Sequence, residues 1–442
     1  MKRSPLIILF FTLFIDMLGF GLILPLIPVY VKHYGGGPWV GGFLMASFSV
    51  TQFIFSPIWG RASDKFGRRP IILISLVGSA ISYLSFGLAS SLAVLFFARI
   101  ASGILTSASL PTAQAYIADV TTPEKRSGGM AVLGAAFGLG FAFGPVIGGY
   151  FSKFSLFGLP SLATPAIVAS SMALLNFVAA CFLLPESLTH NERASSSDKK
   201  MLDVFVDVHR ALRNPRINKP ILVFTFLTFA FAAVESSFSW LVLIRFKDTI
   251  RQTAEQNFLH AYPTQTWVSA AASVQQDFLE KAQAGATTGI FVVVGITILL
   301  TQGAVMGGLA RRIGENRLVC FGLGLLVFAM IGIAIAPSLN VIMMLSACIA
   351  VGSGVSNPSL SALIMQSASH EDRGLISGAQ QGLSSLARIF APPINNRLVE
   401  TNTAYPFICS AVLMAVSLIL SLGIRSIPHT PSDPDAPMPM AH

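Results

Sequence analysis

Charged residues are scarce in this chain. Asp, Glu, Lys and Arg make up 11% of its 442 residues, whereas an average soluble domain carries about 25%. Too few charged side chains are therefore present to cover a water-facing surface. The rest of the composition is apolar, with 53% hydrophobic residues and a mean hydropathy of +0.69. This balance argues against a large soluble protein and favours one that lies in a membrane.

Cysteine is also rare, and the usual catalytic patterns are missing. The four cysteines lie in or at the ends of apolar runs, and none has the spacing of metal ligands. We therefore expect neither a disulfide nor a bound metal. The histidines, His33 among them, lie outside the apolar runs and are expected to be solvated. The sequence holds no phosphate-binding loop and no nucleophile constellation, so it predicts a protein that is not an enzyme and uses no cofactor.

Long apolar runs dominate the sequence instead. Their length of about 18 to 25 residues spans the roughly 30 Å of hydrocarbon in a bilayer. Roughly twelve such runs can be placed, and they predict an all-α integral membrane protein with one transmembrane helix for each run. The runs begin near Leu6, Trp39, Pro70, Leu92, Gly128, Ala163, Pro220, Thr287, Leu318, Leu339, Gly374 and Tyr405.

The basic residues are unevenly distributed between the connecting segments. With the N-terminus inside the cell, most of the 29 Lys and Arg residues fall in inner segments, as the positive-inside rule requires. Both termini are therefore predicted to be cytoplasmic, and a bacterial inner membrane is the expected location. In a soluble protein a net charge of +9 would suggest nucleic-acid binding. Here the Lys and Arg residues are concentrated on the inner side of the predicted spans, which indicates a lipid bilayer as the partner and no nucleic acid.

The chain repeats itself at one offset. When the sequence is shifted by 247 residues, Gly67 meets Gly314 and Pro145 meets Pro392 without a gap between them. Such matches at corresponding places in the hydropathy pattern indicate two parallel six-helix repeats, as in two-lobed secondary transporters. The predicted units are an N-terminal six-helix lobe at 1–185, a cytoplasmic inter-lobe linker at 186–219, a C-terminal six-helix lobe at 220–425 with an outer insertion at about 246–285, and a disordered cytoplasmic tail at 426–442.

One short basic stretch carries a family motif. Residues 60–70 read GRASDKFGRRP, which matches the G-x-x-x-D-x-x-G-R-R/K turn after the second helix in the major facilitator superfamily. RIASG (99–103), AYIADVTTPEKR (115–126) and GLGFAFGPVIGG (138–149) strengthen the match. The chain resembles this superfamily, and within it the twelve-helix drug:proton antiporters of the tetracycline-efflux group. The resemblance covers nearly the whole chain except the outer insertion.

The resemblance implies a conformational latch at this motif. Arg68 would pair with Asp119 at the inner end of the fourth helix, and the cluster would hold the lobes in the outward-open state. From the residues alone, Asp64 can accept from the amides of a helix N-terminus or pair with Arg68. A basic turn that only sets orientation is the alternative. The expected latch residues are Gly60, Asp64, Gly67, Arg68, Arg69 and Asp119.

The fifth predicted helix resembles the antiporter motif of the family. Small residues allow close helix packing, and a proline bends the helix by removing a backbone donor. The motif would shape the lobe interface toward the outer side and hinder leak, and generic small-residue packing is the alternative. The motif residues are Gly140, Gly144, Pro145, Gly148 and Gly149.

Four ionisable side chains fall inside the predicted spans: Asp16, Arg99, Glu235 and Arg388. Each costs at least ~2.5–3.5 kcal/mol at a helix centre, so we expect them to pair across a central cavity. Asp16 is the expected main proton carrier, with Arg99 close enough to adjust its proton affinity, and Glu235 is a second protonatable group. A static buried ion pair is the alternative for both acids. Arg388 is a candidate for the substrate cavity, although a structural role is the stronger expectation.

Two glutamines, Gln52 and Gln302, follow a threonine midway along the second and eighth spans. Similar glutamines face the substrate in the tetracycline group, so the resemblance implies that both line the substrate cavity. Hydrogen bonding between helices is the alternative. The group also carries an acid in the third helix, where this chain has Ser82, and one in the ninth, where it has none. These departures favour a cargo other than a tetracycline–metal complex.

The sequence thus predicts a proton-coupled secondary transporter that exports small amphipathic compounds by alternating access. Its partners would be a small-molecule substrate and protons, and it would work as a monomer. An importer on the same fold, either a symporter or a uniporter, is the main alternative, and a non-transporting membrane receptor is a further one. The outer insertion is a lid, a partner site or a neutral decoration, and decoration is the favoured interpretation.

Overall fold

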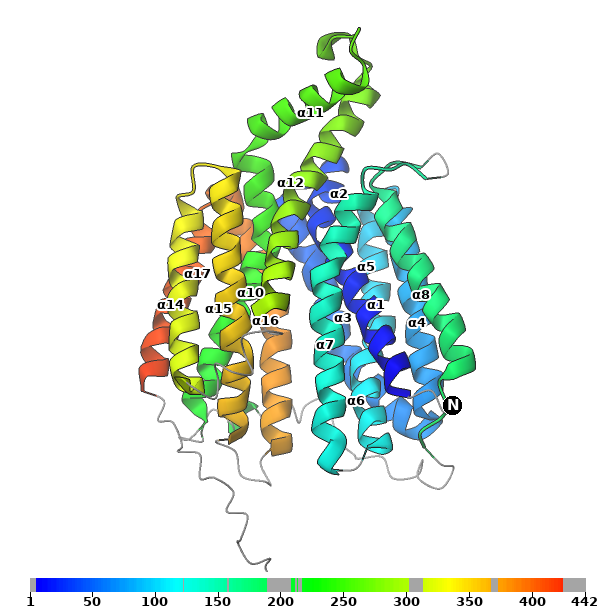
Figure 1. Cartoon of the computed structure of the whole chain (residues 1–442), viewed down its shortest axis with the longest axis vertical. Coiled ribbons are helices and arrows are strands. Elements are labelled where there is room, and N and C mark those ends of the chain that lie inside the picture. Colours follow the sequence, from blue (N-terminus) through cyan, green and yellow to red (C-terminus); the bar gives the residue numbers. More distant parts are fainter. Residues whose placement is uncertain are drawn as a thin grey trace, which may run out of the picture.

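The computed structural model describes residues 5–423 except 122, 157–158, 189–207, 211–212, 214–216, 302–312 and 367–372. Within these residues every regular element is a helix (Figure 1). Ten helical segments are long and apolar enough to cross a membrane. Two further long helices, α7 (Pro123–Phe151) and α16 (Arg373–Thr401), run alongside them and complete the twelve predicted spans.

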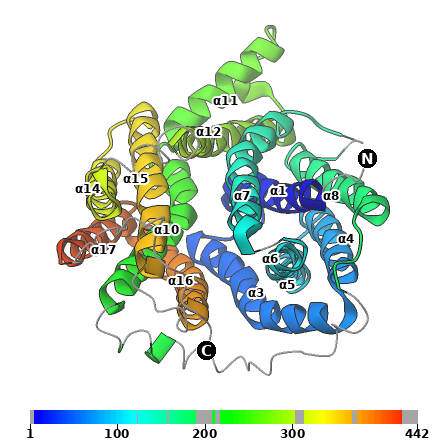
Figure 2. The same cartoon turned by 60° about the horizontal axis from the view of Figure 1, so that its bottom comes forward.

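The N-terminal half supplies six of the spans, which gather on one side of the bundle in Figures 1 and 2. The first span is interrupted near Pro25, because a proline cannot donate to the helical hydrogen-bond ladder. The elements are α1 (Pro5–Ile23), η1 (Leu24–Leu26) and α2 (Ile27–His33); α3 (Pro38–Phe66); α4 (Arg68–Gly87); α5 (Leu92–Thr106) and α6 (Ser109–Val120); α7; and α8 (Ala163–Leu183).

The C-terminal half supplies the other six spans. Its fourth span is one continuous helix, whereas the corresponding span of the N-terminal half is divided into α5 and α6. The spans are α10 (Asn218–Arg245), α12 (Ala272–Leu300), α14 (Glu315–Ala334), α15 (Leu339–Gln366), α16 and α17 (Tyr405–Leu422).

Large apolar side chains lie on the outside of the bundle. Phe182 is 84% exposed and Leu175 71% exposed, both on α8. In water such residues would be a liability, but lipid tails are as apolar as the side chains themselves. The outward apolar surface therefore agrees with a protein that lies in a bilayer.

The family-motif turn is shorter than the sequence suggests. Helix α3 continues to Phe66, so residues 60–66 of the expected turn are helical and the chain turns at Gly67 alone. Gly67 has a φ of +104°, in the left-handed region that a residue with a Cβ adopts only at a cost. Gly314, its counterpart at the repeat offset, has a φ of +85° and also precedes a helix. The internal repeat is therefore visible in the backbone.

The outer insertion is a helical hairpin. Helix α11 (Lys247–Ala261) leads through the short η3 (Trp267–Ser269) into the first turns of α12. Helix α12 begins at Ala272, well before the predicted Thr287. The hairpin projects beyond the other helices (Figure 1). We call this end of the bundle the α11 end, and the opposite end, where α3 meets α4, the Gly67 end.

The hairpin has an aromatic core of its own. Phe258 is fully buried, and its ring contacts the rings of Tyr262, Trp267 and Phe278 in edge-on or tilted arrangements. Such aromatic pairs contribute about 0.5–1.5 kcal/mol each beyond the area they bury. The insertion is thus a folded unit built onto α12.

Candidate transport site

The two lobes meet directly at the α11 end. The backbone amide of Trp39, in the first turn of α3, donates to the Glu400 carboxylate on α16 over 3.0 Å. The sequence predicts a solvated His33, but the structure places its Nδ1 atom 2.5 Å from the Glu280 carboxylate on α12. Glu280 is only 6% exposed, and a buried carboxylate needs such a partner. These contacts close the α11 end in this conformation.

Close helix contacts extend the closure toward the middle of the bundle. A Cβ placed on Gly42 of α3 would lie 2.7 Å from the Pro392 carbonyl oxygen of α16. A Cβ on Gly149 of α7 would overlap the Thr288 side chain of α12. In both places glycine allows helices from different lobes to touch.

A cavity opens between the lobes toward the Gly67 end. Its volume is about 430 Å³, and its walls come from α3 and α6 of one lobe and α10, α15 and α16 of the other. The lining includes Ser56, Gln114, Gln380 and Gln381, and none of its residues within the described chain is charged. In the described conformation this cavity lies on the Gly67 side of the bundle, whereas the contacts given above close the α11 end.

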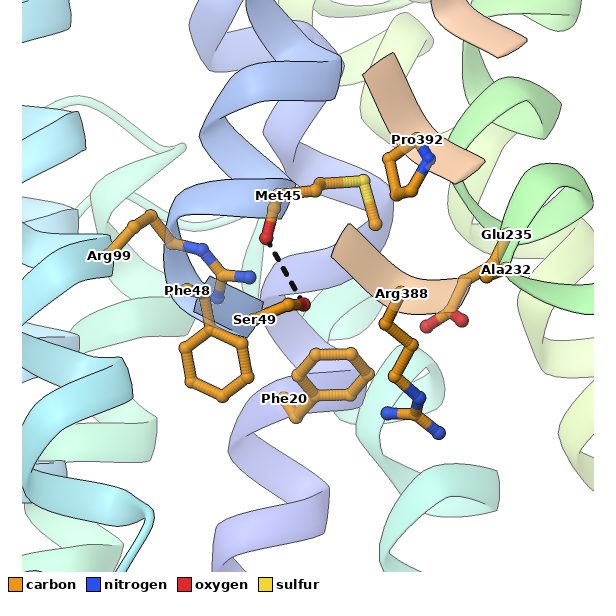
Figure 3. A pocket seen from close by; sticks show the side chains of 9 residues that line it. All are labelled: Phe20, Met45, Phe48, Ser49, Arg99, Ala232, Glu235, Arg388 and Pro392. Carbon is orange, nitrogen blue, oxygen red and sulfur yellow. Dashed lines mark hydrogen bonds between the residues drawn. The ribbon is translucent and has the colours of Figure 1, made fainter. Parts of the chain in front are cut away.

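A smaller cavity lies deeper between the lobes and is lined by charged groups (Figure 3). It holds about 20 Å³ of open space, enough for roughly one water molecule. Arg99 of α5 enters from the N-terminal lobe, and Glu235 of α10 and Arg388 of α16 enter from the C-terminal lobe. The rings of Phe20 and Phe48 lie between the two arginines in this view. Three of the four ionisable residues predicted inside spans thus meet at the centre.

Asp16 does not line this cavity. Its carboxylate accepts a 2.7 Å hydrogen bond from the Ser79 hydroxyl, and the Tyr83 hydroxyl donates to its backbone carbonyl over 3.0 Å. Both partners belong to α4, so Asp16 faces the interior of the N-terminal lobe, where it is 5% exposed. Its Oδ2 atom has no hydrogen-bond partner among the described residues. The expectation that Asp16 pairs across the central cavity is therefore wrong for this conformation.

Arg99 contacts an aromatic ring instead of Asp16. Its guanidinium carbon lies 4.5 Å from the centre of the Phe48 ring, and no ion pair joins it to Asp16 in the described part of the chain. Tyr83 lies within electrostatic range of both groups. A Cβ on Gly19 would overlap the Tyr83 ring, so this glycine of α1 gives the tyrosine its space. The packing of Tyr83 on Gly19 thus orients Asp16 toward α4.

Of the two candidate glutamines, only Gln52 lies within the described residues. Gln52 lies on α3 between Ser49, which lines the charged cavity, and Ser56, which lines the larger one. Residues three and four apart share one face of a helix, so Gln52 lies on α3 between the two cavities and belongs to the lining of neither. Gln302 lies outside the described residues.

Arg68 is the centre of a charge cluster at the Gly67 end. Its Nη1 atom lies 2.5 Å from the Asp64 carboxylate, and its Nε atom lies 3.1 Å from the Asp119 carboxylate. The Ser63 hydroxyl accepts a further bond of 2.7 Å. Both ion pairs expected at the motif are therefore present, and they join α3 and α4 to α6 within the N-terminal lobe. Gly60 contributes its backbone, since its carbonyl accepts from the Ser63 hydroxyl over 2.7 Å, and a Cβ there would meet nothing within 4 Å.

Glu186 is a functional candidate that the sequence reasoning missed. Its carboxylate accepts bonds of 2.9 and 3.2 Å from the backbone amides of Arg68 and Arg69, at the start of α4. The amide-accepting role considered for Asp64 thus belongs to Glu186, which stabilises the positive end of the helix. The Arg69 guanidinium in turn donates to the Cys181 carbonyl of α8 over 2.6 Å. Only the position of this acid just after the sixth apolar run signalled it.

The antiporter motif mainly holds one lobe together. Cβ atoms on Gly140, Gly144 and Gly148 would lie 2.5, 2.6 and 2.9 Å from backbone carbonyl oxygens on successive turns of α1. Gly149 faces α12 of the other lobe, and Pro145 lies inside the helix. Most of the motif therefore sets how closely α7 lies on α1, and one residue contributes to the contact between lobes.

Comparison with known proteins gives the family. The sequence matches the model described as Major Facilitator Superfamily over residues 9–254 and 256–442. The chain belongs to the major facilitator superfamily. It is 28% identical to multidrug resistance protein 2 of Bacillus subtilis over 95% of each chain, and 29% identical to the class E tetracycline resistance protein of Escherichia coli over 92% of each. The solved structure of the human organic anion transporter MFSD10 shares 26% identity and a TM-score of 0.65, over 95% of this chain and 99% of that one.

These findings confirm the resemblance and the fold class predicted from the sequence. This major facilitator is an all-helical membrane transporter built from two six-helix repeats. It is not an enzyme, because its family and its relatives are transporters. Multidrug and tetracycline resistance proteins are among those relatives.

Proposed function

We propose that this major facilitator is a proton-coupled antiporter that exports small amphipathic compounds by alternating access. The observation that carries the proposal is the group of buried charges at the centre: Arg99, Glu235 and Arg388 around one cavity, with Asp16 buried behind it. A membrane interior keeps ionisable groups where they serve a substrate or ion path. The names of the multidrug and tetracycline resistance relatives support a drug-like cargo.

Asp16 is the proposed main proton carrier. A buried acid that has no ionic partner is costly while it is charged, so the neutral, protonated form is favoured. The Ser79 hydroxyl donates to one carboxylate oxygen of Asp16, the Ser109 hydroxyl lies near the carboxylate, and Oδ2 has no hydrogen-bond partner in the described chain. A proton on that oxygen would neutralise the acid here, and a movement of α1 relative to α4 would expose it for release. Glu235, within electrostatic range of Arg388 and Arg99, is the proposed second protonatable group.

In the proposed cycle the α11 end and the Gly67 end open in turn. Opening the α11 end requires the His33–Glu280 and Trp39–Glu400 contacts to separate. In the proposed cycle, closing the Gly67 end brings the Arg68 cluster against the C-terminal lobe and stabilises the outward-open state. The close packing of α7 on α1 would make these two helices move as one unit.

Export follows from the proposed orientation. We place the Gly67 end in the cytoplasm of a bacterial cell, since the basic turns lie there. The larger cavity then takes its cargo from the cytoplasm, and proton entry from outside drives the release. A proton moving inward down a potential of 100 mV yields about 2.3 kcal/mol. An importer with the same geometry would move its solute and the proton in one direction, which a flux assay distinguishes.

Everted membrane vesicles that contain the protein test this proposal. They are energised so that the lumen is acidic, amphipathic compounds are added one at a time, and lumen pH is recorded. Wild type is compared with Asp16→Asn and with a control, Asp248→Asn, at an exposed position of α11. We expect at least one compound to release protons with wild type and with the control, but not with Asp16→Asn.

Two results would contradict the proposal. Proton release that persists in Asp16→Asn would remove Asp16 from the coupling. If no compound moves protons while a solute equilibrates equally through all three proteins, the transporter is a uniporter and Asp16 is structural.

A further inference from the structure

We infer that the transported compound is an organic anion, a carboxylate or sulfonate carried on an aromatic or apolar body, and that Arg99 and Arg388 bind its charged group. The inference rests on the proposed transport function and names the substrate class of the same site.

The charge of the cavities favours an anion. Within the described residues, the charged side chains that line the two cavities are Arg99, Arg388 and Glu235. Two cations and one acid leave one positive charge in excess, in a region where water is sparse and charges interact strongly. Asp16 does not cancel this excess, because its carboxylate faces α4 and accepts from Ser79. A bound anion would balance the site.

Arg99 has bonding capacity left for a ligand. It is 6% exposed, and its Nε atom has no hydrogen-bond partner in the described part of the protein. Buried guanidinium groups are normally paired, and their planar fork matches the two oxygens of a carboxylate. The face of the Phe48 ring, 4.5 Å away, supports the cation without using its N–H groups. The unused donor therefore points to an acceptor that arrives with the substrate.

The second arginine comes from the other lobe. Arg388 lies on α16, and Glu235, on the neighbouring α10, lies within electrostatic range of both arginines. The two arginines already balance the charge of this acid, so Glu235 would attract an organic cation only weakly. A positive ligand here would face both guanidinium groups, and like charges at short range are unfavourable. An anion in the cavity that both arginines line would instead link the two lobes.

The surroundings suit an apolar body attached to that charge. Phe20, Phe48 and Met45 border the charged cavity (Figure 3). The neutral cavity of about 430 Å³, which Leu110 and Phe224 help to line, lies between the lobes on the side of the Gly67 end. Binding sites for drug-sized compounds are about 300–1,000 Å³ and largely apolar, with a few placed polar groups. The arrangement therefore fits an amphiphile with its charged end deep in the bundle.

Equilibrium binding to the purified full-length protein tests this inference. Two radiolabelled probes share one aromatic body and differ in charge: naphthylacetate is the anion and naphthylmethyl-trimethylammonium is the cation. We expect wild type to bind the anion more tightly. Arg388→Gln should weaken naphthylacetate binding by about tenfold to a hundredfold, the loss of one charge-assisted contact. Arg388→Lys should lose less, and Arg251→Gln, at an exposed position of α11, should lose nothing.

A second variant, expected to change anion binding in the opposite direction, keeps the test decisive if Arg388→Gln does not fold. Glu235→Gln removes the acid from the cavity, so it should strengthen naphthylacetate binding and leave the cation no better bound. Size-exclusion chromatography checks that each variant is folded. Tighter binding of the cation than of the anion, binding of neither probe, or naphthylacetate binding that no cavity variant changes would overturn the inference.

Failure of the inference can be told apart from failure of the proposed function. Binding is measured without a gradient and so does not depend on proton coupling. Anion binding without any proton release in vesicles would contradict the coupling alone. Proton release in vesicles driven by cations, and not by anions, would contradict the substrate class alone.

Discussion

Replacing Gly144 by alanine adds one methyl group where α7 lies on α1. The new Cβ would lie 2.6 Å from the Leu18 carbonyl oxygen and 2.9 Å from two backbone atoms of Gly21, whereas ordinary contact begins at 3.4 Å. All three neighbours are main-chain atoms, so no change of rotamer relieves the overlap. The helices must separate by about 0.8 Å, the difference between 3.4 and 2.6 Å. Overpacking of this kind costs about 1–3 kcal/mol.

Thermal unfolding in detergent measures this cost. We expect Gly144→Ala to unfold at a lower temperature than wild type. Gly324→Ala on α14 is the matched control, because its added Cβ meets nothing within 4 Å. Where a glycine has room and a compatible backbone, alanine stabilises a protein by about 0.4–1 kcal/mol. Equal unfolding temperatures for the two variants would refute the close packing of α7 on α1.

Three further changes test other contacts. Gly67→Ala forces alanine into a φ of +104° and should lower stability by about 1–2 kcal/mol. Gly60→Ala, inside helix α3 with open space around its Cβ, should unfold at or above the wild-type temperature; the reverse order would contradict the turn geometry. Glu280→Gln removes the carboxylate that His33 contacts, so a cysteine introduced at the closed α11 end should be labelled faster by a soluble thiol reagent, and unchanged labelling would count against this closure. Glu186→Gln removes a negative charge from the start of α4 and should lower stability by about 0.3–1 kcal/mol, seen as a lower unfolding temperature whose difference from wild type shrinks in high salt; an unchanged temperature would argue against this role.

The spans were predictable because a bilayer leaves the chain few choices. Helices α5, α8, α15 and α17 begin at Leu92, Ala163, Leu339 and Tyr405, where the apolar runs begin. The prediction was wrong where a helix outlasts its apolar run. Helix α12 starts at Ala272 because the polar insertion is helical too. Hydropathy reports the length in contact with lipid, and it does not report where the hydrogen-bonded ladder ends.

The site was predictable in its membership and not in its geometry. Charge inside a span is costly, which singled out Asp16 along with the three residues that line the cavity. Which way Asp16 faces depends on how α1 is rotated, and that is set by the packing of Tyr83 on Gly19. The contact between Glu186 and Arg68 joins residues 118 positions apart. No local pattern encodes such a contact.

The central claim is that Asp16 couples cargo movement to protons. It is tested most directly in proteoliposomes with wild type or Asp16→Asn, using a compound that released protons in vesicles. Two quantities are measured for each protein: exchange of labelled for unlabelled compound without a gradient, and accumulation driven by a pH gradient. We predict that Asp16→Asn keeps exchange and loses accumulation, because binding and alternation remain while coupling is lost. Accumulation by Asp16→Asn at the wild-type level would contradict the claim.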